Sequence, residues 1–432
     1  MTELSGWGLF PQIDCRVVRA RCEDDVRKAV LAAPLIARGN GRAYGDAALN
    51  PGQTLDMTGM DRMLSFKDGM LVAEAGVLLA DIIHAFLPRG WFPLVTPGTK
   101  MVSLGGAIAA DVHGKNHHVD GSFRSCVDWV ELMGMDGEVS RVAPGDELFE
   151  WTLGGMGLTG VILRAQIRLR PVESSWIVQD SKALTSLTET IDAFEAAMDA
   201  PYSVAWIDCT DGPQHGHSIL LLGRHARSED LPADRPKFNL QRRGKIPVPF
   251  GMPLLFKGRA LQLINSAYWR LKARRAGRAL VDWDSYFYPL DGLANWNKLY
   301  GRNGFIQFQC VLPRDMAPDG LAKLMAAIAE SKQGSVLSVL KRFGPQTSHF
   351  SFPMAGYTLA MDFPANERSL ALMEQLDKIT LAHGGRFYLA KDARMAQAVA
   401  KADPRAETFA AMRKETGLAA RFASVQSERL GL

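Results

Sequence analysis

The sequence predicts an α+β fold made of two domains, on three observations. The chain has 432 residues, which is enough for two domains. Apolar residues make up 47% of it, so a large core is expected rather than disorder. Up to residue 172, short strands and helices alternate with Gly-rich loops, whereas residues 173–385 interleave strands with two long helices. The second pattern is typical of an antiparallel sheet with helices on one face.

Local patterns before the break at Pro171-Val172 indicate the elements of the first domain. Apolar residues at helical spacing predict helices at Asp24–Leu31 and Leu79–Phe86. Apolar runs predict strands at Leu31–Ile36, Val127–Met133 and Glu138–Val142. One more strand is expected at Val161–Leu169, where apolar residues alternate with Arg164, Gln166 and Arg168 as in a half-buried strand.

Past that break, strands are expected at Val204–Cys209, Ser218–Leu222 and Phe305–Leu312, and helices at Leu321–Lys332 and Glu367–His383. Gln307 and Gln309 lie two residues apart in the third of these strands and therefore share one face. Paired amides on one face are suited to sugar hydroxyls. The alternative is an ordinary strand edge that faces solvent.

The stretch Met101–Ser122 joins a glycine run to a dense polar cluster. Glycine lets backbone N–H groups approach a ligand that a Cβ would block, and oriented amides bind anions such as a diphosphate. The polar residues that follow are of the kind a redox cofactor site needs. The alternative is a Gly-rich turn followed by a solvated polar loop.

Two further Gly-rich segments favour the ligand-binding interpretation. Ala37–Ala48 follows an apolar run but matches neither the dinucleotide fingerprint nor a Walker loop, so an ordinary hairpin is an alternative. Leu153–Pro171 opens with four glycines within seven residues. Three such loops in the first 160 residues predict a backbone wrapped closely around a large ligand.

These residues resemble a known family. The runs RGNGRAYGD, TPGTKMVSLGGAIAADVHGKNHH and ELFEWTLGGMGLTGV are similar to the FAD-linked oxidases of the vanillyl-alcohol-oxidase type. The likeness continues through NKLYGRNGFIQFQCVLP, LKRFGP, FSFPMAGYTLAMDFP and GGRFYLAKDAR, so it spans nearly the whole chain. Within the family it is strongest to the decaprenylphosphoryl-ribose 2′-oxidases, the flavoprotein halves of an epimerase.

The resemblance implies an architecture and a cofactor. It implies a PCMH-type FAD-binding domain at 1–172, a substrate-binding domain with an antiparallel sheet at 173–385, and a segment at 386–432 that returns to the FAD domain. The implied FAD-binding residues are Ala37, Arg38, Gly39, Asn40, Gly41, Arg42, Ala43, Tyr44, Gly45, Gly98, Ser103, Leu104, Gly105, Gly106, Ala110, Asp111, Val112, His113, Asn116, Val161 and Tyr388. Relatives with covalent flavin have a His where this chain has Arg42, so non-covalent FAD is expected.

The resemblance also implies site residues. His113, Lys391 and Lys115 are the catalytic candidates, since alcohol oxidation by a flavin needs a hydride acceptor and a place for the hydroxyl proton. His113 is alternatively only a wall of the cofactor pocket, and Lys391 an ordinary surface lysine. The substrate candidates are Tyr300, Gln307, Gln309, Lys341, Phe343 and Lys391. Mycobacterial members have a cysteine where this chain has Ala360, so covalent inhibitors aimed at that thiol are expected to fail here.

The implied activity is oxidation of C2 of a ribosyl unit on a polyprenyl phosphate. The 2-keto product would be reduced by a separate NAD(P)H-dependent partner, giving the arabinose donor for a cell-envelope polysaccharide. Two alternatives remain at this point. One is an oxidase of sugar alcohols or aldonolactones that uses oxygen; the other is a non-catalytic flavin fold or a nucleic-acid-binding protein.

Charge is distributed unevenly along the chain. Residues 224–278 contain 14 Lys or Arg and 3 Asp or Glu, although the whole chain has a net charge of only +4. Aromatic and aliphatic residues are mixed with these cations, including Phe250, Leu254, Leu255, Phe256, Tyr268 and Trp269. Such a mixture favours an anionic membrane surface. A mobile loop is the main alternative, and nucleic-acid contact is not expected.

The cysteines, the N-terminus and the length of the apolar runs indicate where in the cell the protein is expected. Five scattered cysteines without a C-x-x-C motif indicate reduced thiols, and no metal site is expected because His117 and His118 lack further ligands at suitable spacing. The N-terminus lacks the features of a signal peptide, and no apolar run is long enough to span a bilayer. We therefore expect a cytoplasmic protein, peripherally associated with the inner membrane.

Overall fold

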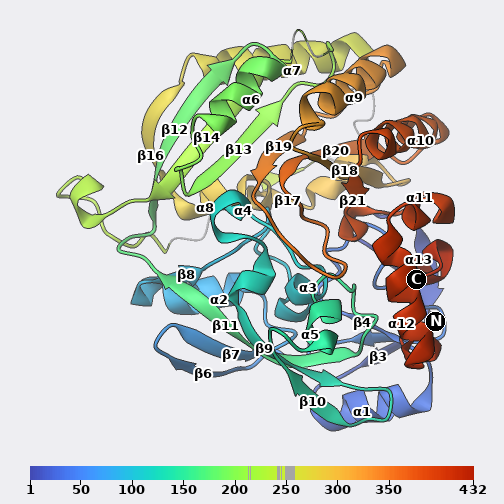
Figure 1. Ribbon diagram of the computed structural model, residues 1–432. Coiled ribbons are helices and arrows are strands. Elements are labelled where there is room, and N and C mark those ends of the chain that lie inside the picture. Colours follow the sequence, from blue (N-terminus) through green and yellow to red (C-terminus); the bar gives the residue numbers. More distant parts are fainter. Residues whose placement is uncertain (213, 215, 241–243, 245, 249–257) are drawn as a thin grey trace.

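The computed structural model describes the chain except for residues 213, 215, 241–243, 245 and 249–257. It contains two large sheets with helices, stacked one above the other in Figure 1. The architecture is a mixed α+β fold, as the sequence predicts. No strand of one large sheet pairs with a strand of the other among the described residues. The predicted domain boundaries themselves remain a prediction.

The lower sheet is built from residues 63–171. Its strand order is β10-β9-β11-β7-β6, and β8 also pairs with β11. The bounds are β6 Met63–Lys67, β7 Met70–Glu74, β8 Trp91–Pro93, β9 Val127–Met133, β10 Val139–Val142 and β11 Val161–Pro171. In β11 the apolar residues are buried and the alternate polar ones are not, as the sequence pattern predicts. The helices α2 (Leu79–Phe86) and α3 (Leu104–Ala109) contribute to the core of this half.

A small parallel sheet with the order β3-β5-β4 lies at the N-terminal end of the fold. Its strands are β3 Val17–Arg19, β4 Ile36–Arg38 and β5 Thr54–Asp56, and β1 (Thr2–Ser5) pairs separately with β2 (Gln12–Cys15). The strand expected at Leu31–Ile36 is wrong. Helix α1 (Glu23–Ala32), whose Val26, Ala29 and Val30 bury one helical face, extends into the first two of these residues, Leu31 and Ala32. Pro34 prevents its continuation, and the strand begins only at Ile36.

The upper sheet has eight strands in the order β16-β12-β14-β13-β19-β20-β18-β21, all antiparallel. The bounds are β12 Trp176–Leu184, β13 Tyr202–Ile207, β14 Ser218–His225, β16 Gly277–Asp282, β18 Phe305–Pro313, β19 Ser338–Phe343, β20 Gly356–Pro364 and β21 Arg386–Phe387. The short strands β15 (Ile246–Pro247) and β17 (Leu293–Ala294) pair with each other. The antiparallel sheet predicted for this half is therefore present.

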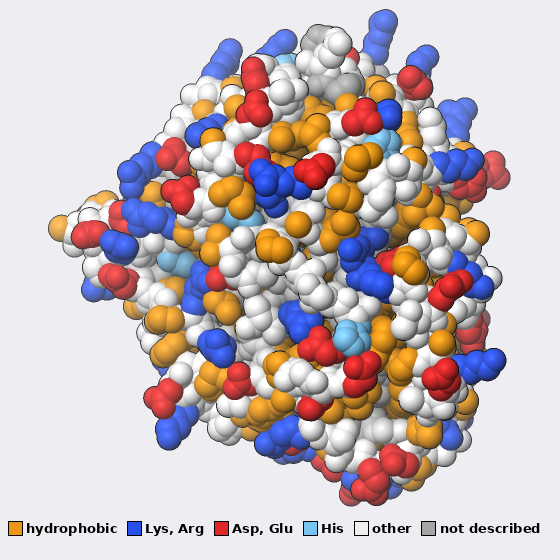
Figure 2. Space-filling view, in the orientation of Figure 1, with side chains coloured by type: hydrophobic (Ala, Val, Ile, Leu, Met, Phe, Trp, Pro, Cys, Tyr) orange, Lys and Arg blue, Asp and Glu red, His pale blue; other side chains and the backbone are white. Residues whose placement is uncertain are grey.

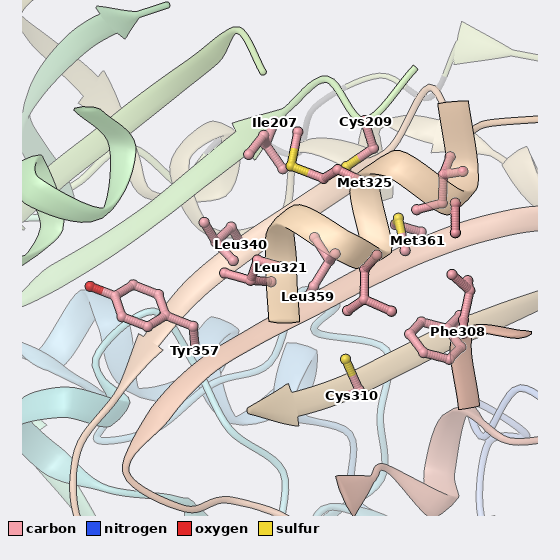
Figure 3. Close-up of a cluster of buried hydrophobic side chains, with 14 of the residues drawn as sticks. Ile207, Cys209, Phe308, Cys310, Leu321, Met325, Leu340, Tyr357, Leu359 and Met361 are labelled. Atoms are coloured by element: carbon pink, nitrogen blue, oxygen red, sulfur yellow. The ribbon is translucent and has the colours of Figure 1, made fainter. Parts of the chain in front are cut away.

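Three helices cover one face of the upper sheet: α6 (Leu187–Glu195), α9 (Ala317–Ser331) and α10 (Glu367–Ala382). Figure 3 shows the core between them, where Leu321 and Met325 of α9 meet Leu340, Leu359 and Met361 of the sheet. Helix α9 starts at Ala317, four residues before the predicted position, because Pro318 suits the first turn of a helix. The opposite face of the sheet points toward the lower half.

The C-terminal segment packs beside the N-terminal sheet. It contains α11 (Gln397–Lys401), α12 (Pro404–Glu415) and α13 (Val425–Leu430), and both chain ends lie on the same side of the molecule in Figure 1. Leu35 forms a bridge with Phe422, and Arg429 pairs with Asp46 at 2.7 Å. Among the described residues, no helix is both long and apolar enough to cross a membrane.

Candidate active site

A cavity of about 1020 Å³ lies between the two halves of the fold. Loops of residues 37–162 form one wall, and the uncovered face of the upper sheet forms the other. Helices α7 (Gly258–Ala273) and α8 (Trp283–Phe287) and the turn Leu389–Lys391 complete it. The volume is at the upper end of the range for small-molecule sites, so there is room for a large ligand.

The loop after β4 forms one end of this cavity. Gly41 there has a φ of 61°, a conformation that favours glycine. A Cβ on Gly39 would lie 1.9 Å from Ser103 Oγ, so this loop and the Met101–Ser122 stretch approach too closely for a side chain. Within the described chain, the backbone N–H groups of residues 40–43 donate to no protein acceptor. Successive free amides at a cavity wall are suited to the oxygens of a diphosphate.

Arg42 adds a positive charge to this end of the cavity. Its guanidinium carbon lies 4.0 Å from the ring centre of Trp7. Its Nε is buried and has no hydrogen-bond partner among the described residues. Burial lowers the pKa of Arg42. A buried donor without an acceptor, next to free amides, points to an anionic ligand in this part of the cavity.

A buried hydrogen-bond chain holds the Met101–Ser122 stretch from behind. Gln346 donates to Asp111 at 3.0 Å, and His117 Nε2 lies 3.0 Å from Gln346 Oε1. His117 Nδ1 accepts from the backbone N–H of Gly344 at 3.2 Å, so Nε2 carries the proton. Burial lowers the pKa of His117 to about 4, which keeps the ring neutral. This chain positions the loop and keeps Asp111 and His117 behind the cavity wall.

His113 lies on the cavity wall among three aromatic rings. Its ring centre is 4.8 Å from that of Phe343, 5.6 Å from that of Phe352 and 5.0 Å from that of Tyr388. Burial, together with the charges of Lys341, His117 and Lys391, holds the pKa of His113 well below its usual value. The imidazole is therefore neutral at physiological pH.

The neighbouring hydrogen bonds determine which nitrogen of His113 carries the proton. Thr358 donates its hydroxyl hydrogen to the carbonyl of Cys310 at 2.8 Å, so its oxygen can only accept from Gln309 Nε2, at 3.1 Å. The second hydrogen of Gln309 Nε2 then points to His113 Nε2, at 3.0 Å. His113 Nε2 is thus an acceptor, and Nδ1 carries the proton. Nδ1 is buried and has no partner among the described residues, so it is available to donate to a ligand.

Three of the lysines that line the cavity have a lowered pKa: Lys115, Lys341 and Lys391. Lys115 Nζ donates to the carbonyl oxygens of Tyr286 at 2.5 Å and Phe287 at 3.2 Å. Burial, reinforced by the charge of Lys341, lowers the pKa of Lys115 to about 7. Burial alone lowers the pKa of Lys341 to about 8. Buried cations gathered in one enclosed site, where Lys341 lowers the pKa of its neighbours, favour an anionic ligand.

Lys391 and Asp362 lie near the paired glutamines and influence each other electrostatically. Lys391 Nζ lies 3.6 Å from the ring centre of Tyr44, and Asp362 accepts a hydrogen bond from Gln307. Burial lowers the pKa of Lys391, Asp362 opposes that shift, and Lys341 reinforces it. Burial raises the pKa of Asp362. A lysine with a depressed pKa has a neutral amine available near physiological pH.

The structure brings most of the sequence-predicted residues to the cavity. Those that line it are Ala37, Gly39, Asn40, Gly41, Arg42, Ala43, Tyr44, Gly98, Ser103, Gly105, Gly106, Ala110, Val112, His113, Lys115, Gln307, Gln309, Lys341, Tyr388 and Lys391. Those that lie behind the wall are Arg38, Gly45, Leu104, Asp111, Asn116, Val161, Tyr300 and Phe343. Leu104 and Val161 belong to hydrophobic cores, and Arg38 donates to the Ser5 carbonyl at 2.8 Å.

Sequence reasoning missed part of the wall. Lys100 forms a buried ion pair with Asp284, and Asp291 accepts from Thr99 at 2.8 Å and from the Lys100 backbone at 2.9 Å. These contacts hold α8 and the following turn Pro289–Gly292 against the loop at residues 96–101. Only the pairing of two distant segments reveals them, and no local pattern does. Trp206 and its apolar neighbours on the sheet were missed because both faces of their strands are apolar.

The cavity fits a flavin dinucleotide. Free amides and Arg42 suit a diphosphate at one end, and polar groups suited to a redox centre gather at His113 and Lys391. Residues 16–143 match the family model described as an FAD binding domain. The fold and the site therefore define an FAD-dependent oxidoreductase.

Relatives identify the branch. The chain is 34% identical to decaprenylphosphoryl-beta-D-ribose oxidase of Mycolicibacterium smegmatis over 99% of this chain and 97% of that protein. It is 33% identical to an uncharacterised Streptomyces coelicolor protein over 82% of this chain and all of that protein. A shorter match, 31% identical over 28% of this chain and 40% of the relative, is to UDP-N-acetylenolpyruvoylglucosamine reductase of Acidiphilium cryptum. This chain belongs to the FAD-linked oxidase family that includes decaprenylphosphoryl-β-D-ribose oxidase.

Proposed function

We propose that this protein oxidises the C2 hydroxyl of a ribose carried on a polyprenyl phosphate, giving the 2-keto sugar. The observation that supports this most strongly is a cavity lined both by three lysines with a lowered pKa and by two buried glutamines. Lysines suit a phosphate and amides suit sugar hydroxyls. The name of the Mycolicibacterium smegmatis relative points to the same substrate. The alternatives of a non-catalytic flavin fold and a nucleic-acid binder have no comparable support.

The residues divide the chemistry between them. Oxidation of an alcohol to a ketone removes a hydride from carbon and a proton from oxygen, and bound FAD supplies the hydride acceptor. In this proposal the neutral amine of Lys391 takes the hydroxyl proton. His113 holds the reacting group by donating from Nδ1, because its Nε2 is already occupied by Gln309. Lys115 and Lys341 hold the phosphate, and Gln307 and Gln309 orient the sugar.

Anaerobic bleaching of the bound flavin tests this function. The panel consists of polyprenyl-phosphoryl ribose, the same lipid with a 2-deoxyribose, free ribose 5-phosphate and soluble alditols. We expect rapid bleaching by the ribosyl lipid and none by the 2-deoxy analogue, which is the matched control. Fast bleaching by alditols with peroxide formation in air would instead identify an oxygen-using polyol oxidase. No bleaching by any member would reject the proposal.

The product and cofactor lead to two further proposals. A 2-keto sugar on a lipid must be reduced to give the epimer, so we infer a separate NAD(P)H-dependent reductase as partner. FAD is bound non-covalently, because the first loop has Arg42 and no histidine. Acid precipitation should leave the yellow colour in the supernatant. A yellow pellet would show a covalent link.

We also propose that α7 docks on an anionic membrane, with the protein peripheral to the inner membrane. Leu263 is 71% exposed and Leu271 49% exposed. Arg259 and Arg270 are exposed on the same helix, and Arg274 is exposed directly after it. Figure 2 shows Lys and Arg side chains along the upper edge, where α7 lies in Figure 1. The apolar residues Phe250, Leu254, Leu255 and Phe256, which suggested this surface in the sequence, lie outside the described residues.

Flotation with vesicles tests the docking surface. The full-length protein should float with phosphatidylglycerol vesicles and not with phosphatidylcholine alone. The double variant Leu263→Gln/Leu271→Gln should lose most of the floated fraction. Leu64→Gln, at an apolar residue 44% exposed on β6, is the matched control and should float normally. Equal flotation of all three proteins would reject this surface.

A further inference from the structure

A straight apolar row leads away from the paired glutamines across the upper sheet. Gln309 on β18 is in register with Ala360 on β20, and Ala360 with Val339 on β19. Val339 is in register with Trp206 on β13, and Trp206 with Ile219 on β14. All five side chains line the cavity. Four strand spacings separate Gln309 from Ile219, which is about 19 Å.

Neighbouring residues widen this row into a strip. Val204 and Leu221 are a second cross-strand pair on β13 and β14, and Leu337 flanks Val339 on β19. None of the residues of β13 and β14 that line the described cavity is charged. Trp206 donates its indole N–H to the carbonyl of Val336 at 3.0 Å, so the face of its ring is left for apolar contact. The strip is thus apolar, although it begins beside the polar residues around Gln309.

The far end of the strip lies against α7. The rings of Trp206 and Tyr268 are 4.8 Å apart and meet edge to face. Tyr268 and Lys272 of α7 and Arg275, two residues after it, line the cavity, and all three are exposed. The cavity therefore opens at the helix that also exposes Leu263 and Leu271. An apolar chain leaving the strip there would pass between cations, as it does between the headgroups of an anionic bilayer.

We infer that the strip formed by Val204, Trp206, Ile219, Leu221, Leu337 and Val339 binds the first isoprene units of a lipid-linked substrate. This inference rests on the proposed function and adds the place of the hydrocarbon chain to it. The sugar lies at Gln307 and Gln309, the phosphate at the lysines, and the chain crosses β19, β13 and β14 to leave beside α7. The strip thereby selects substrates by chain length as well as by sugar.

Binding of isoprenyl phosphates without a sugar tests the strip directly. The probes are geranyl phosphate, farnesyl phosphate and inorganic phosphate, titrated calorimetrically into the FAD-loaded protein below their micellar concentrations. Farnesyl phosphate should bind roughly tenfold more tightly than geranyl phosphate, because one more isoprene unit is buried. Inorganic phosphate should bind most weakly. Affinity that does not depend on chain length would overturn the inference.

Two variants distinguish binding of the hydrocarbon chain in the strip from binding on the exposed side of α7. Leu221→Gln should reduce the gain from geranyl to farnesyl phosphate to less than about threefold, since it puts an amide into the strip. Leu263→Gln, on the exposed side of α7, should keep the full gain. Equal loss in both variants would place the chain on the helix surface and not in the strip. If Leu221→Gln fails to fold with FAD, Val339→Thr gives the same test with a nearly unchanged shape.

The failure of this inference and the failure of the proposed function are distinguishable. If isoprenyl phosphates show the chain-length gain but no ribosyl lipid bleaches the flavin, the strip stands and the sugar is wrong. If ribosyl phosphates with short and long chains bleach it with the same KM, the function stands and the strip is wrong.

Discussion

Gln309 donates to His113 Nε2 because its other amide hydrogen is committed to Thr358. Two residues of the upper sheet thus determine the protonation of a ring that belongs to the lower half of the fold. His113 therefore faces the cavity as a hydrogen-bond donor and cannot accept the hydroxyl proton through Nδ1. Lys115, Lys341 and Lys391 line the described cavity with lowered pKa values, so a neutral lysine amine can accept that proton.

Gln309→Glu should therefore impair the reaction while FAD remains bound. A carboxylate accepts from His113 Nε2, which moves the proton from Nδ1 and removes the donor from the cavity. We expect a fall in the rate constant of flavin reduction of about 10²-fold, with a smaller change in KM. Stopped-flow reduction by the substrate measures this. Gln333→Glu is the control for the added charge, because Gln333 lies outside the described cavity and its side-chain oxygen accepts from Ser369, and the two variants should differ in rate at least tenfold. Equal rates would contradict the role of the tautomer.

Lys391 should be needed in its neutral form. Burial lowers its pKa, so the rate of flavin reduction should rise with pH as the amine loses its proton and fall as pH decreases. Lys391→Met should lower the rate by roughly 10²–10⁴-fold and remove this pH dependence. Lys391→Arg keeps a charge but cannot accept a proton, so it should be as slow as the methionine variant. Full activity in the arginine variant would show that only the charge matters.

Lys341 should make binding of isoprenyl phosphates depend on pH. Its pKa of about 8 in the free protein means that the charge is present below pH 8 and is lost above it. A bound phosphate favours the charged form, so affinity should be highest below pH 8 and fall as pH rises through that value. Titration with farnesyl phosphate between pH 6.5 and 9.5 measures the slope. Lys341→Met should bind about tenfold more weakly at pH 7 and with a shallower pH profile; an unchanged profile would exclude Lys341 from the phosphate site.

Local patterns were sufficient for part of the site and insufficient for the rest. Glycine at positions 39 and 41 is a local signal, and so is the two-residue spacing of Gln307 and Gln309, because strand alternation puts both on one face. The electrostatic interaction of Asp362 with Lys391 depends on how β20 and residues 389–391 meet, and the sequence contains no sign of it. The wrong strand at Leu31–Ile36 has a similar cause, since a short apolar run fits a strand or a buried helix end equally well.

Sequence patterns were also insufficient to reveal the apolar strip. The sequence predicts strands at β13 and β14, but both faces of these strands are apolar. This pattern is typical of a strand buried in a core. One face packs against α6 and α9, and the other faces the cavity and meets α7 only at its far end. Only the register of five strands shows that Gln309 and Ile219 lie on one line. Composition alone cannot separate a core from a binding surface for hydrocarbon.

Arg429 should contribute strongly to stability. It lies on α13 and pairs with Asp46 at 2.7 Å and Asp392 at 2.8 Å, two carboxylates that are both buried. Arg429→Gln leaves both without their cation, and we expect a loss of about 3–5 kcal/mol in the free energy of unfolding. Chemical denaturation followed by tryptophan fluorescence measures it. Arg19→Gln is the control: the Arg19 side chain is 60% exposed and pairs with Asp56 at the surface, so its loss should cost less than about 1 kcal/mol. A similar small cost for both variants would show that the C-terminal segment is held by its apolar contacts with the N-terminal sheet and not by this ion pair.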